Sequence, residues 1–387
     1  MACSGTVAGS GADGGAGGDA GVGAPDADPG PDFDAVFGLD RLHEIDIQVD
    51  ESDLDQLEND RENRVPCTIT FDGTVIANAG IRQKGGYGSS STLDGKPGFS
   101  VKFNEFVPGQ TLFGLHKLLL NNAQEDPTFL SEHIGYEVHR RAGRPATFTA
   151  HGIVTLNGFT YGLFVVKEAV AEDFLERNFG RPNDQGNLYE GFYHPDDQSL
   201  GDFVSHPEEL DLKDEIEEMR TRDDVEALAA AIADSPDAEF ETSVGALLDL
   251  DSYLTGFALD ALLGYWDSYA FFLNNYYLYH DPGSGRFVYI PHGMDQLRYD
   301  GFDPASYPMG RLAQRVRDIP ALDARYTSEQ ARLLDQVWDV AALTARIDRA
   351  AATIHSTTRS DERTAADLAS FDDHVEEVRQ SIAARAP

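Results

Sequence analysis

The sequence predicts an α+β fold with two lobes, an antiparallel sheet in the N-terminal lobe and a largely helical C-terminal lobe. Short alternating strands joined by tight turns fill residues 42–167, whereas helical patterns predominate in residues 168–387. Residues 1–32 consist almost entirely of Gly, Ala, Asp, Pro, Ser and Val. Because such a segment buries too little apolar surface to offset its ordering entropy, we expect a disordered tether followed by one folded domain.

The composition limits the classes of function. The 387-residue chain is 41% hydrophobic and 10% aromatic, which is enough for a substantial core. Its apolar runs stop well short of the roughly 18 residues that a membrane helix needs, so we expect no transmembrane span. The formal net charge of −37 repels nucleic acid and acidic membranes and argues against both as partners. It would attract a basic protein, although solubility or a salty or external environment explains it more simply.

Lysine and cysteine are both scarce. The lysines are Lys84, Lys96, Lys102, Lys117, Lys167 and Lys213. Cys67 lies in an apparent strand and is most simply a small core residue, so no disulfide framework or zinc site is expected. Cys3 follows Met-Ala and resembles the end of a bacterial lipoprotein signal without its apolar region. It is either a lipid anchor on an exported chain or a chance cysteine in the tether.

The elements of the N-terminal lobe follow from local patterns. Residues 43–50 alternate as a half-buried strand does, and 53–60 favour a short helix. A hairpin over 65–85 turns at Asp72-Gly73, and a Gly/Ser-rich loop leads to a strand over 99–106. A helix is predicted from Asp126-Pro127 to Gly143, then a hairpin that turns at Asn157-Gly158, then a helix over 171–180.

The C-terminal lobe is predicted to bring polar residues together around a hairpin. Residues 195–239 are acidic and helical, and 247–265 form an apolar helix. Asp267 and two asparagines precede a hairpin that turns at 281–285, Asp295 follows it, and helices fill the chain from about residue 320. A protein kinase core has the same order of elements. There is no zinc-hydrolase motif, nucleophile elbow or P-loop.

Asp267, Asn275 and Asp295 fit the chemistry of phosphoryl transfer. Asp267, at the end of an apolar helix, is placed to take the proton of an acceptor hydroxyl, or else merely ends the helix by bonding local backbone. Asn275 and Asp295 offer the hard oxygen ligands that Mg²⁺ prefers, and Asp295 would bridge the metal to nucleotide phosphates. Asn274 is expected only to shape the loop, which is also the alternative role for Asn275, and a surface-turn role is the alternative for Asp295.

The Gly/Ser-rich loop and the cations around it are candidates for phosphate binding. The residues are Arg82, Lys84, Gly85, Gly86, Lys96 and Lys102. Loop backbone N–H groups would cradle phosphates, and Arg82 and Lys84 share one face of their strand. Solvated charges on an edge strand are the simpler alternative.

Two glutamates are further candidates for the nucleotide cleft. Glu137 falls within the apolar stripe of Leu130, Ile134 and Val138, and a buried carboxylate needs a partner. Either Arg141 or a phosphate-binding lysine from the sheet would pair with it. Glu168 would line the cleft where the lobes join, or lie in an exposed linker.

Four segments together resemble the CotH (spore coat protein H) family of atypical protein kinases. They are residues 81–103, 118–143, 157–191 and 266–296, in family order. The resemblance implies phosphorylation of protein Ser/Thr hydroxyls with ATP and Mg²⁺ or Mn²⁺, outside the cytosol or in a surface layer. His292, where the family commonly has Trp, and the apolar stretch Ala270–Leu273 depart from the pattern.

Two other functions fit the same residues. One is a non-catalytic surface or adhesion protein that keeps the fold and binds a partner. The other is a kinase-fold transferase that acts on a non-protein acceptor or transfers AMP. The substrate and the oligomeric state are not predicted.

Overall fold

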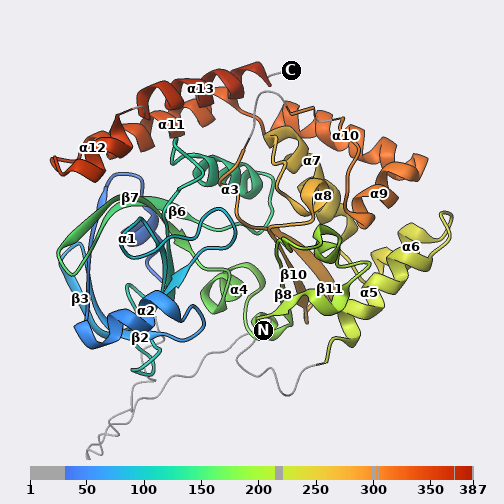
Figure 1. The fold of residues 1–387 in the computed structure, drawn as a ribbon. Helices are drawn as coiled ribbons and strands as arrows, with labels where there is room; N and C mark the ends of the chain where they lie inside the picture. Colours follow the sequence, from blue (N-terminus) through green and yellow to red (C-terminus); the bar gives the residue numbers. More distant parts are fainter. Residues whose placement is uncertain (1–30, 214–220, 298–301, 304, 370, 386–387) are drawn as a thin grey trace, which may run out of the picture. The chain divides into compact units, whose positions relative to one another are not determined.

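The computed structural model describes residues 31–213, 221–297, 302–303, 305–369 and 371–385. The predicted tether, with Cys3, lies outside these residues apart from its last two positions. Residues 31–387 form one compact unit, which Figure 1 shows from blue to red along the chain. The predicted α+β class is confirmed, and the boundary of the two lobes near residue 168 stays a prediction.

The N-terminal strands close into a barrel rather than an open antiparallel sheet. The strands are β1 (His43–Val49), β2 (Val65–Phe71), β3 (Thr74–Lys84), β4 (Gly98–Lys102), β5 (Lys117–Asn121), β6 (Thr149–Leu156) and β7 (Phe159–Glu168). Their order is β1-β2-β3-β4-β5-β7-β6, and the barrel closes because β6 pairs in parallel with β1. Alternating side chains such as Ile45, Ile47, Phe99 and Val101 fill its interior, as does Cys67.

Three helices accompany the barrel: α1 (Phe33–Phe37), α2 (Leu54–Asn59) and α3 (Ser131–Arg141). Helix α3 starts later than the Asp126-Pro127 pair predicts, because Phe129 has φ of 54° and interrupts any helix there. The Asp126 carboxylate instead accepts hydrogen bonds from the backbone N–H groups of Thr128 (3.0 Å) and Ser131 (2.9 Å). The predicted apolar stripe of α3 is confirmed as buried.

The rest of the chain combines a second sheet with helices. The sheet has the order β11-β10-β8-β9 and consists of β8 (Leu188–Gly191), β9 (Asp211–Leu212), β10 (Tyr276–Asp281) and β11 (Arg286–Pro291). The helices are α4 (Glu172–Phe179), α5 (Asp223–Asp234), α6 (Phe240–Gly245), α7 (Leu250–Leu263), α8 (Tyr269–Phe272), α9 (Arg311–Asp318), α10 (Pro320–Gln336), α11 (Val340–His355), α12 (Glu362–Leu368) and α13 (Phe371–Ala384). Helices α11 and α13 pack on each other, and α12 rests on β7 (Figure 1).

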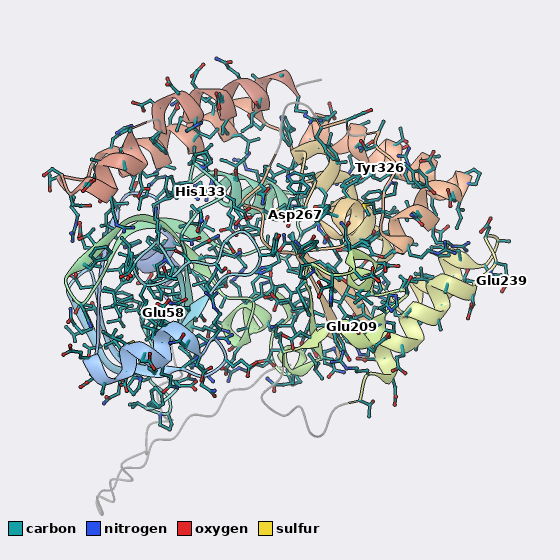
Figure 2. The ribbon with its side chains drawn as sticks, in the orientation of Figure 1. Glu58, His133, Glu209, Glu239, Asp267 and Tyr326 are labelled. Atoms are coloured by element: carbon teal, nitrogen blue, oxygen red, sulfur yellow. The ribbon has the colours of Figure 1, made fainter. Side chains whose placement is uncertain are left out.

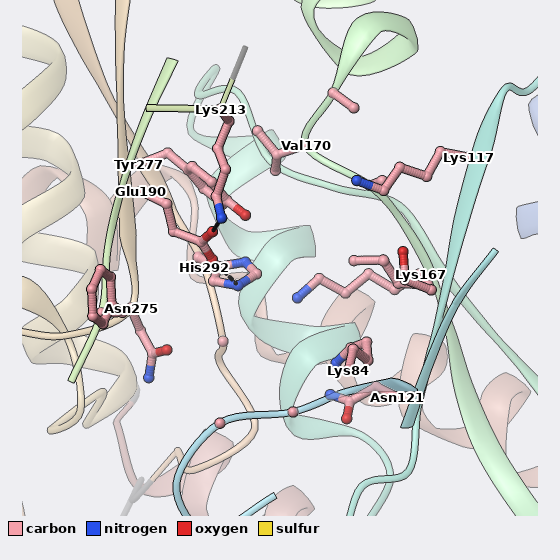
Figure 3. Close-up of a pocket in the computed structure, with 18 of the residues that line it drawn as sticks. Lys84, Lys117, Asn121, Lys167, Val170, Glu190, Lys213, Asn275, Tyr277 and His292 are labelled. Carbon is pink, nitrogen blue, oxygen red and sulfur yellow. Dashed lines mark ion pairs between the residues drawn. The ribbon is translucent and has the colours of Figure 1, made fainter. Parts of the chain in front are cut away.

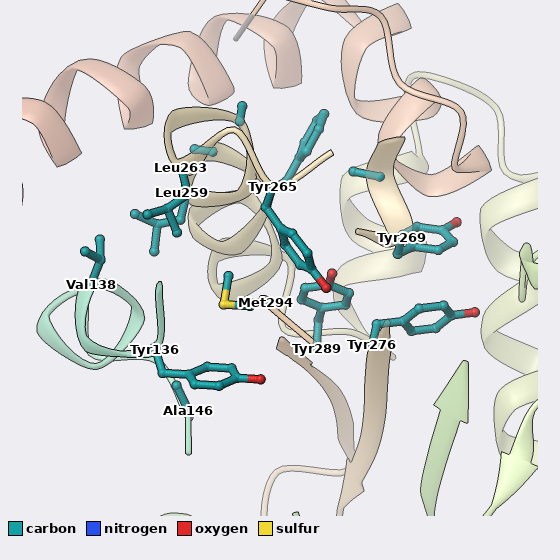
Figure 4. Packing of buried hydrophobic residues seen from close by; sticks show 14 of the residues in the cluster. Tyr136, Val138, Ala146, Leu259, Leu263, Tyr265, Tyr269, Tyr276, Tyr289 and Met294 are labelled. Atoms are coloured by element: carbon teal, nitrogen blue, oxygen red, sulfur yellow. The ribbon is translucent and has the colours of Figure 1, made fainter. Parts of the chain in front are cut away.

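A cluster of buried tyrosines supports the second sheet. Tyr265, Tyr269, Tyr276 and Tyr289 lie close together beside Met294, and each is at most 1% exposed (Figure 4). Their rings supply large apolar area, while their hydroxyl groups need hydrogen-bond partners when buried. Because Tyr265 precedes Asp267 by two residues and Met294 immediately precedes Asp295, this cluster adjoins the segments that carry those two carboxylates. Within the described part of the chain, none of the helices has the length and apolarity that a membrane span requires.

Candidate active site

A cavity of about 1480 Å³ separates the barrel from the second sheet. The outward side chains of β3, β4, β5 and β7 form one wall, and β8, the end of β11 and the loop after α7 form the other (Figure 3). Small-molecule sites typically occupy about 300–1,000 Å³. This cavity therefore has room for a nucleotide and for part of an acceptor molecule.

Asp267 lies at one end of this cavity, between the barrel and the helical part of the molecule (Figure 2). Helix α7 ends at Gly264, which has φ of 65°, and the chain then turns toward the cavity. The Asp267 carboxylate accepts hydrogen bonds from Asn275 Nδ2 (2.7 Å) and Asn274 Nδ2 (3.1 Å), and the residue is 7% exposed. Burial, with a smaller contribution from the charge of Glu125, raises the pKa of Asp267 to about 6. A carboxylate with this pKa suits a general base near neutral pH.

Asn275 is held between the two loops of the site. Its backbone has φ of 55°, and a Cβ atom on Gly293 would lie 2.5 Å from Asn275 Oδ1, so a side chain at position 293 would displace the Asn275 amide. The hydroxyl of Tyr265 donates to the backbone carbonyls of His292 and Gly293. Tyr265 therefore ties the loop that carries Asp267 to the loop that carries Asp295.

The residues present fit a divalent metal shared with nucleotide phosphates. Asn275 Nδ2 is used by Asp267, whereas Asn275 Oδ1 accepts no hydrogen bond from the described residues. Burial and the neighbouring charge of Glu132 raise the pKa of Asp295 to about 7, which a bound cation would reverse. Across the described residues, no three His, Cys, Asp or Glu side chains form a metal cage. Mg²⁺ commonly takes only one or two carboxylates plus substrate phosphates, so no such cage is needed.

A buried ion pair links the barrel to α3 beside Asp295. Lys167 Nζ lies 2.5 Å from Glu132 Oε1 and 2.8 Å from the hydroxyl oxygen of Tyr136, and Asn121 Nδ2 donates to Glu132 Oε2 at 2.6 Å. Both ionic side chains are at most 2% exposed. Burial raises the pKa of Glu132, but the charges of Lys167 and Lys84 outweigh it and hold the pKa below its usual value. Protein kinases use a lysine–glutamate pair of this type at the nucleotide phosphates.

Comparison with known proteins identifies the family. Residues 81–387 match the family described as CotH kinase protein. The chain belongs to this CotH family. The inner spore coat protein H of Bacillus subtilis (strain 168) is 25% identical over 233 residues, which cover 58% of this chain and 61% of that relative. The match thus spans less than two thirds of the relative's length.

Two solved structures are similar at low identity. The proinflammatory kinase CtkA of Helicobacter pylori is 12% identical, with a TM-score of 0.32, over 80% of this chain and 97% of the other. HipA of Shewanella oneidensis MR-1, solved in complex with HipB and its operator DNA, is 13% identical, with a TM-score of 0.34, over 78% and 65% of the two chains. Both TM-scores are below 0.5, so neither structure bears on the chemistry of this CotH-family chain.

Most of the predicted phosphate-binding residues line the cavity. They are Arg82, Lys84, Gly85, Gly86 and Lys102. Gly85 has φ of 121°, and a Cβ atom there would lie 2.9 Å from the Ser89 carbonyl oxygen, so the loop conformation requires glycine. Burial and the charge of Lys167 lower the pKa of Lys84. Arg82 donates to the Arg61 carbonyl oxygen at 2.7 Å, and Lys102 pairs with Glu105 at 3.3 Å.

Three of the predicted residues do not line the cavity. Of the two partners predicted for Glu137, the structure shows arginine: its carboxylate lies 2.9 Å from both Arg140 and Arg141. Lys96 Nζ turns toward α12 and lies 2.9 Å from Asp367.

Glu168 is also placed elsewhere, neither in the cleft nor in an exposed linker. It is 1% exposed and pairs with Arg177 on α4 at 2.7 Å, so its charge is neutralised inside the protein.

Sequence reasoning missed the Lys167–Glu132 pair and several other groups of the cavity. Lys117, Lys213 and Glu190 line it as well, and Asn274, expected only to shape the loop, contacts Asp267 directly. Five of the six lysines in the chain line this one cavity, Lys96 being the exception. The scarcity of lysine was the signal that pointed to these residues, and it applied to five of the six lysines rather than only to those around the Gly-rich loop.

The structure shows where both departures from the family pattern lie. His292 lies on the cavity wall with Nε2 3.4 Å from Glu190 Oε1. The stretch Ala270–Leu273 completes the short helix α8, whose Ala270 and Phe271 side chains are buried in the core next to the tyrosine cluster.

Proposed function

We propose that this protein is a metal-dependent kinase that transfers the γ-phosphoryl group of a nucleoside triphosphate, expected to be ATP, to Ser/Thr hydroxyls of a protein. One observation carries the proposal: Asp267, Asn275 and Asp295 converge in the cavity that also holds the Lys167–Glu132 pair and the Gly-rich loop. A purely structural protein has no need of this combination. Membership of the CotH family supports the same conclusion.

Each residue has a role in this reaction. Lys167 and Lys84 bind the phosphates, and Glu132 holds Lys167 in place. Asn275 and Asp295 would hold Mg²⁺ or Mn²⁺, which neutralises charge that develops on the phosphates. Asp267 accepts the proton of the acceptor hydroxyl while the hydroxyl oxygen bonds to the γ-phosphorus. The bond between the γ-phosphorus and the oxygen that bridges it to the β-phosphate breaks, and ADP leaves with that oxygen.

The client and the location are part of the proposal. A chain with a net charge of −37 associates best with a basic protein, so we propose a basic client. The relative from Bacillus subtilis is named an inner spore coat protein. By analogy we place this chain outside the cytosol, in a coat or surface layer, with Cys3 as the candidate lipid anchor.

Transfer of label from γ-³²P-ATP tests the proposal. The purified chain is incubated alone and with a generic basic protein, in Mg²⁺, Mn²⁺ or EDTA, beside Asp267→Ala and Asp295→Ala. Asp335→Ala is the matched control, because Asp335 is exposed on α10 and does not line the cavity. We expect metal-dependent label that both site variants lose and the control keeps.

Other outcomes assign other functions. Label from α-³²P-ATP in place of γ-³²P-ATP would show AMP transfer. Metal-dependent nucleotide binding with label on an added sugar, and none on protein, would show a non-protein acceptor. If neither label is transferred and calorimetry detects no metal-dependent nucleotide binding, the protein is a non-catalytic surface protein and the proposal is wrong.

A further inference from the structure

Strand register separates two ends of the barrel wall inside the cavity. Lys84 lies opposite Gly98, whereas Lys102, four residues further along β4, lies opposite Lys117 on β5. At about 3.3 Å per residue, four residues correspond to ~13 Å along the strands. Lys167, opposite Leu119, occupies the row between them. The wall therefore presents lysine at both ends and in the middle.

The end that carries Lys84 is the phosphate end. The charges of Lys84 and Lys167 both act on Asp295 and on Glu132. Asp295 is the metal ligand of the proposed function, on which this inference rests. The phosphates of a bound nucleotide therefore lie against these two lysines and the Gly-rich loop.

Lys117 lies at the other end, where the nucleoside must be. Leu118 pairs with Glu168, so Lys117 is adjacent to the segment Ala169–Ala171 that leaves β7 and lines the cavity. Figure 3 shows Lys117 and Val170 at one end of the cavity, with Lys84 and Asn275 at the other. A nucleotide with its phosphates at Lys84 and Lys167 and its length along the strands brings its base to Lys117.

Within the described residues, Lys117 has no partner of the kind that Lys102 has. Within the described residues its ammonium group makes no hydrogen bond or ion pair, whereas Lys102 opposite it pairs with Glu105. Its charged surroundings are mostly positive: Arg64 and Arg82, with Glu190 and Lys213 on the opposite wall. Burial and the two arginines lower the pKa of Lys117 to about 7. Such a group is stabilised by a ligand that brings hydrogen-bond acceptors.

Guanine and adenine differ in the hydrogen-bond acceptors that they offer to a lysine. Guanine presents two adjacent acceptors, O6 and N7, and lysine is a common partner for this edge. Adenine presents N7 beside the N6 amino group, a donor, and an ammonium group has no acceptor to offer it. We propose that Lys117 recognises the O6/N7 edge of guanine and that the protein uses GTP at least as efficiently as ATP. The phosphoryl-transfer step itself is unchanged, and GDP leaves in place of ADP.

Parallel kinetics with γ-³²P-GTP and γ-³²P-ATP test the proposal on the full chain. The quantity measured is the ratio of kcat/KM for GTP to kcat/KM for ATP. We expect a ratio of one or more for the wild type and a fall of about tenfold or more in Lys117→Met, since a good bidentate contact to a base edge discriminates against the wrong base by about that factor. Lys117→Gln should shift the ratio toward ATP further still, because an amide pairs with N6 and N7 of adenine.

Lys102→Met is the matched control, because it removes the same charge from the same row but from a lysine that already has a carboxylate partner. Its ratio should stay within about twofold of the wild type. Calorimetry with Mg-GDP and Mg-ADP gives an independent readout of base preference and shows that each variant is folded.

A wild-type ratio below one, or a ratio that Lys117→Met lowers less than tenfold, overturns the inference and leaves the proposed kinase activity standing. Absence of transfer and of metal-dependent binding with either nucleotide overturns the proposed function as well.

Discussion

Gly293 shows at the scale of one residue how the site depends on its surroundings. A Cβ atom there would lie 2.5 Å from Asn275 Oδ1, and its φ of 58° already disfavours a side chain. Gly293→Ala should therefore displace the Asn275 amide and weaken metal-dependent nucleotide binding by about tenfold or more, measured by calorimetry with Mg²⁺.

Gly285→Ala is the control that separates displacement of the Asn275 amide from the effect of backbone strain. Gly285 has φ of 68°, and nothing lies within 4 Å of its added Cβ. We expect Gly285→Ala to lower the free energy of unfolding by about 1–2 kcal/mol through backbone strain, as Gly293→Ala should also do. Unlike Gly293→Ala, it should leave nucleotide binding unchanged. Equal binding by the two variants would contradict the role assigned to Asn275.

The lowered pKa of Lys117 predicts how the free energy of unfolding depends on pH. Its pKa is about 7 in the folded protein and 10.5 ordinarily, so between these values the unfolded chain holds a proton that the folded protein lacks. This lysine therefore makes the free energy of unfolding rise with pH from about 7 to 10. Thermal unfolding without nucleotide should show Lys117→Met more stable than the wild type at pH 7, with a difference that shrinks toward pH 10. A difference independent of pH would contradict the lowered pKa.

At the scale of elements, the Lys167–Glu132 pair joins β7 to α3 and has two separable effects. Glu132→Ala leaves a buried ammonium group without its partner, which should cost about 3–5 kcal/mol in the free energy of unfolding. The double variant Glu132→Leu with Lys167→Met removes both charges and should recover most of that stability, as measured by urea denaturation. Phosphoryl transfer should stay lost in both, because Glu132→Ala removes the carboxylate that holds Lys167 in place and the double variant removes Lys167 itself. Recovery of transfer in the double variant would exclude Lys167 from the chemistry.

Local patterns predicted most of the elements. The helical structure expected over residues 195–239 is found, among the residues described there, only as α5, because residues 195–212 contain short 3₁₀ turns and strand β9, which pairs with β8. Contacts between distant elements decided what local patterns could not predict. The hairpin turns at Asp72-Gly73, Asn157-Gly158 and residues 281–285 were all found, because their residues favour the turn by themselves. Closure of the barrel depends on a pairing of β1 with β6, about a hundred residues apart in sequence, for which no local pattern exists.

The pairing of Glu137 with arginine rather than with a lysine has a similar cause. The prediction assumed that α3 has one buried stripe and one solvated face. In the structure α3 is buried on several sides, so Glu132, outside the stripe, is buried against Lys167. Glu137, by contrast, pairs with Arg140, Arg141 and Arg346. The convergence of Asp267, Asn275 and Asp295 on one cavity was predictable, because their spacing around one hairpin is local.

At the scale of the whole molecule, lysine is concentrated where an anionic ligand is expected. A chain with a net charge of −37 places five of its six lysines around one cavity. The acidic remainder repels a free nucleotide at long range, while the lysines attract it at short range. The same acidic surface attracts a basic client. The nucleotide therefore interacts mainly with the lysines of the cavity, and the client with the acidic surface.

Salt should therefore affect the two substrates unequally. Contacts of a basic client with an exposed acidic surface are screened as the Debye length falls from about 10 Å at 0.1 M to 3 Å at 1 M, whereas the buried lysines are screened much less. Between 0.05 and 0.5 M NaCl, KM for a polybasic client should rise about tenfold or more, while KM for the nucleotide changes only a few-fold. A peptide of the same length with its basic residues replaced by glutamine serves as the control, and its KM should not follow the salt. If KM for the basic client is unaffected by salt, the acidic surface does not recruit the client and reflects solubility or the environment alone.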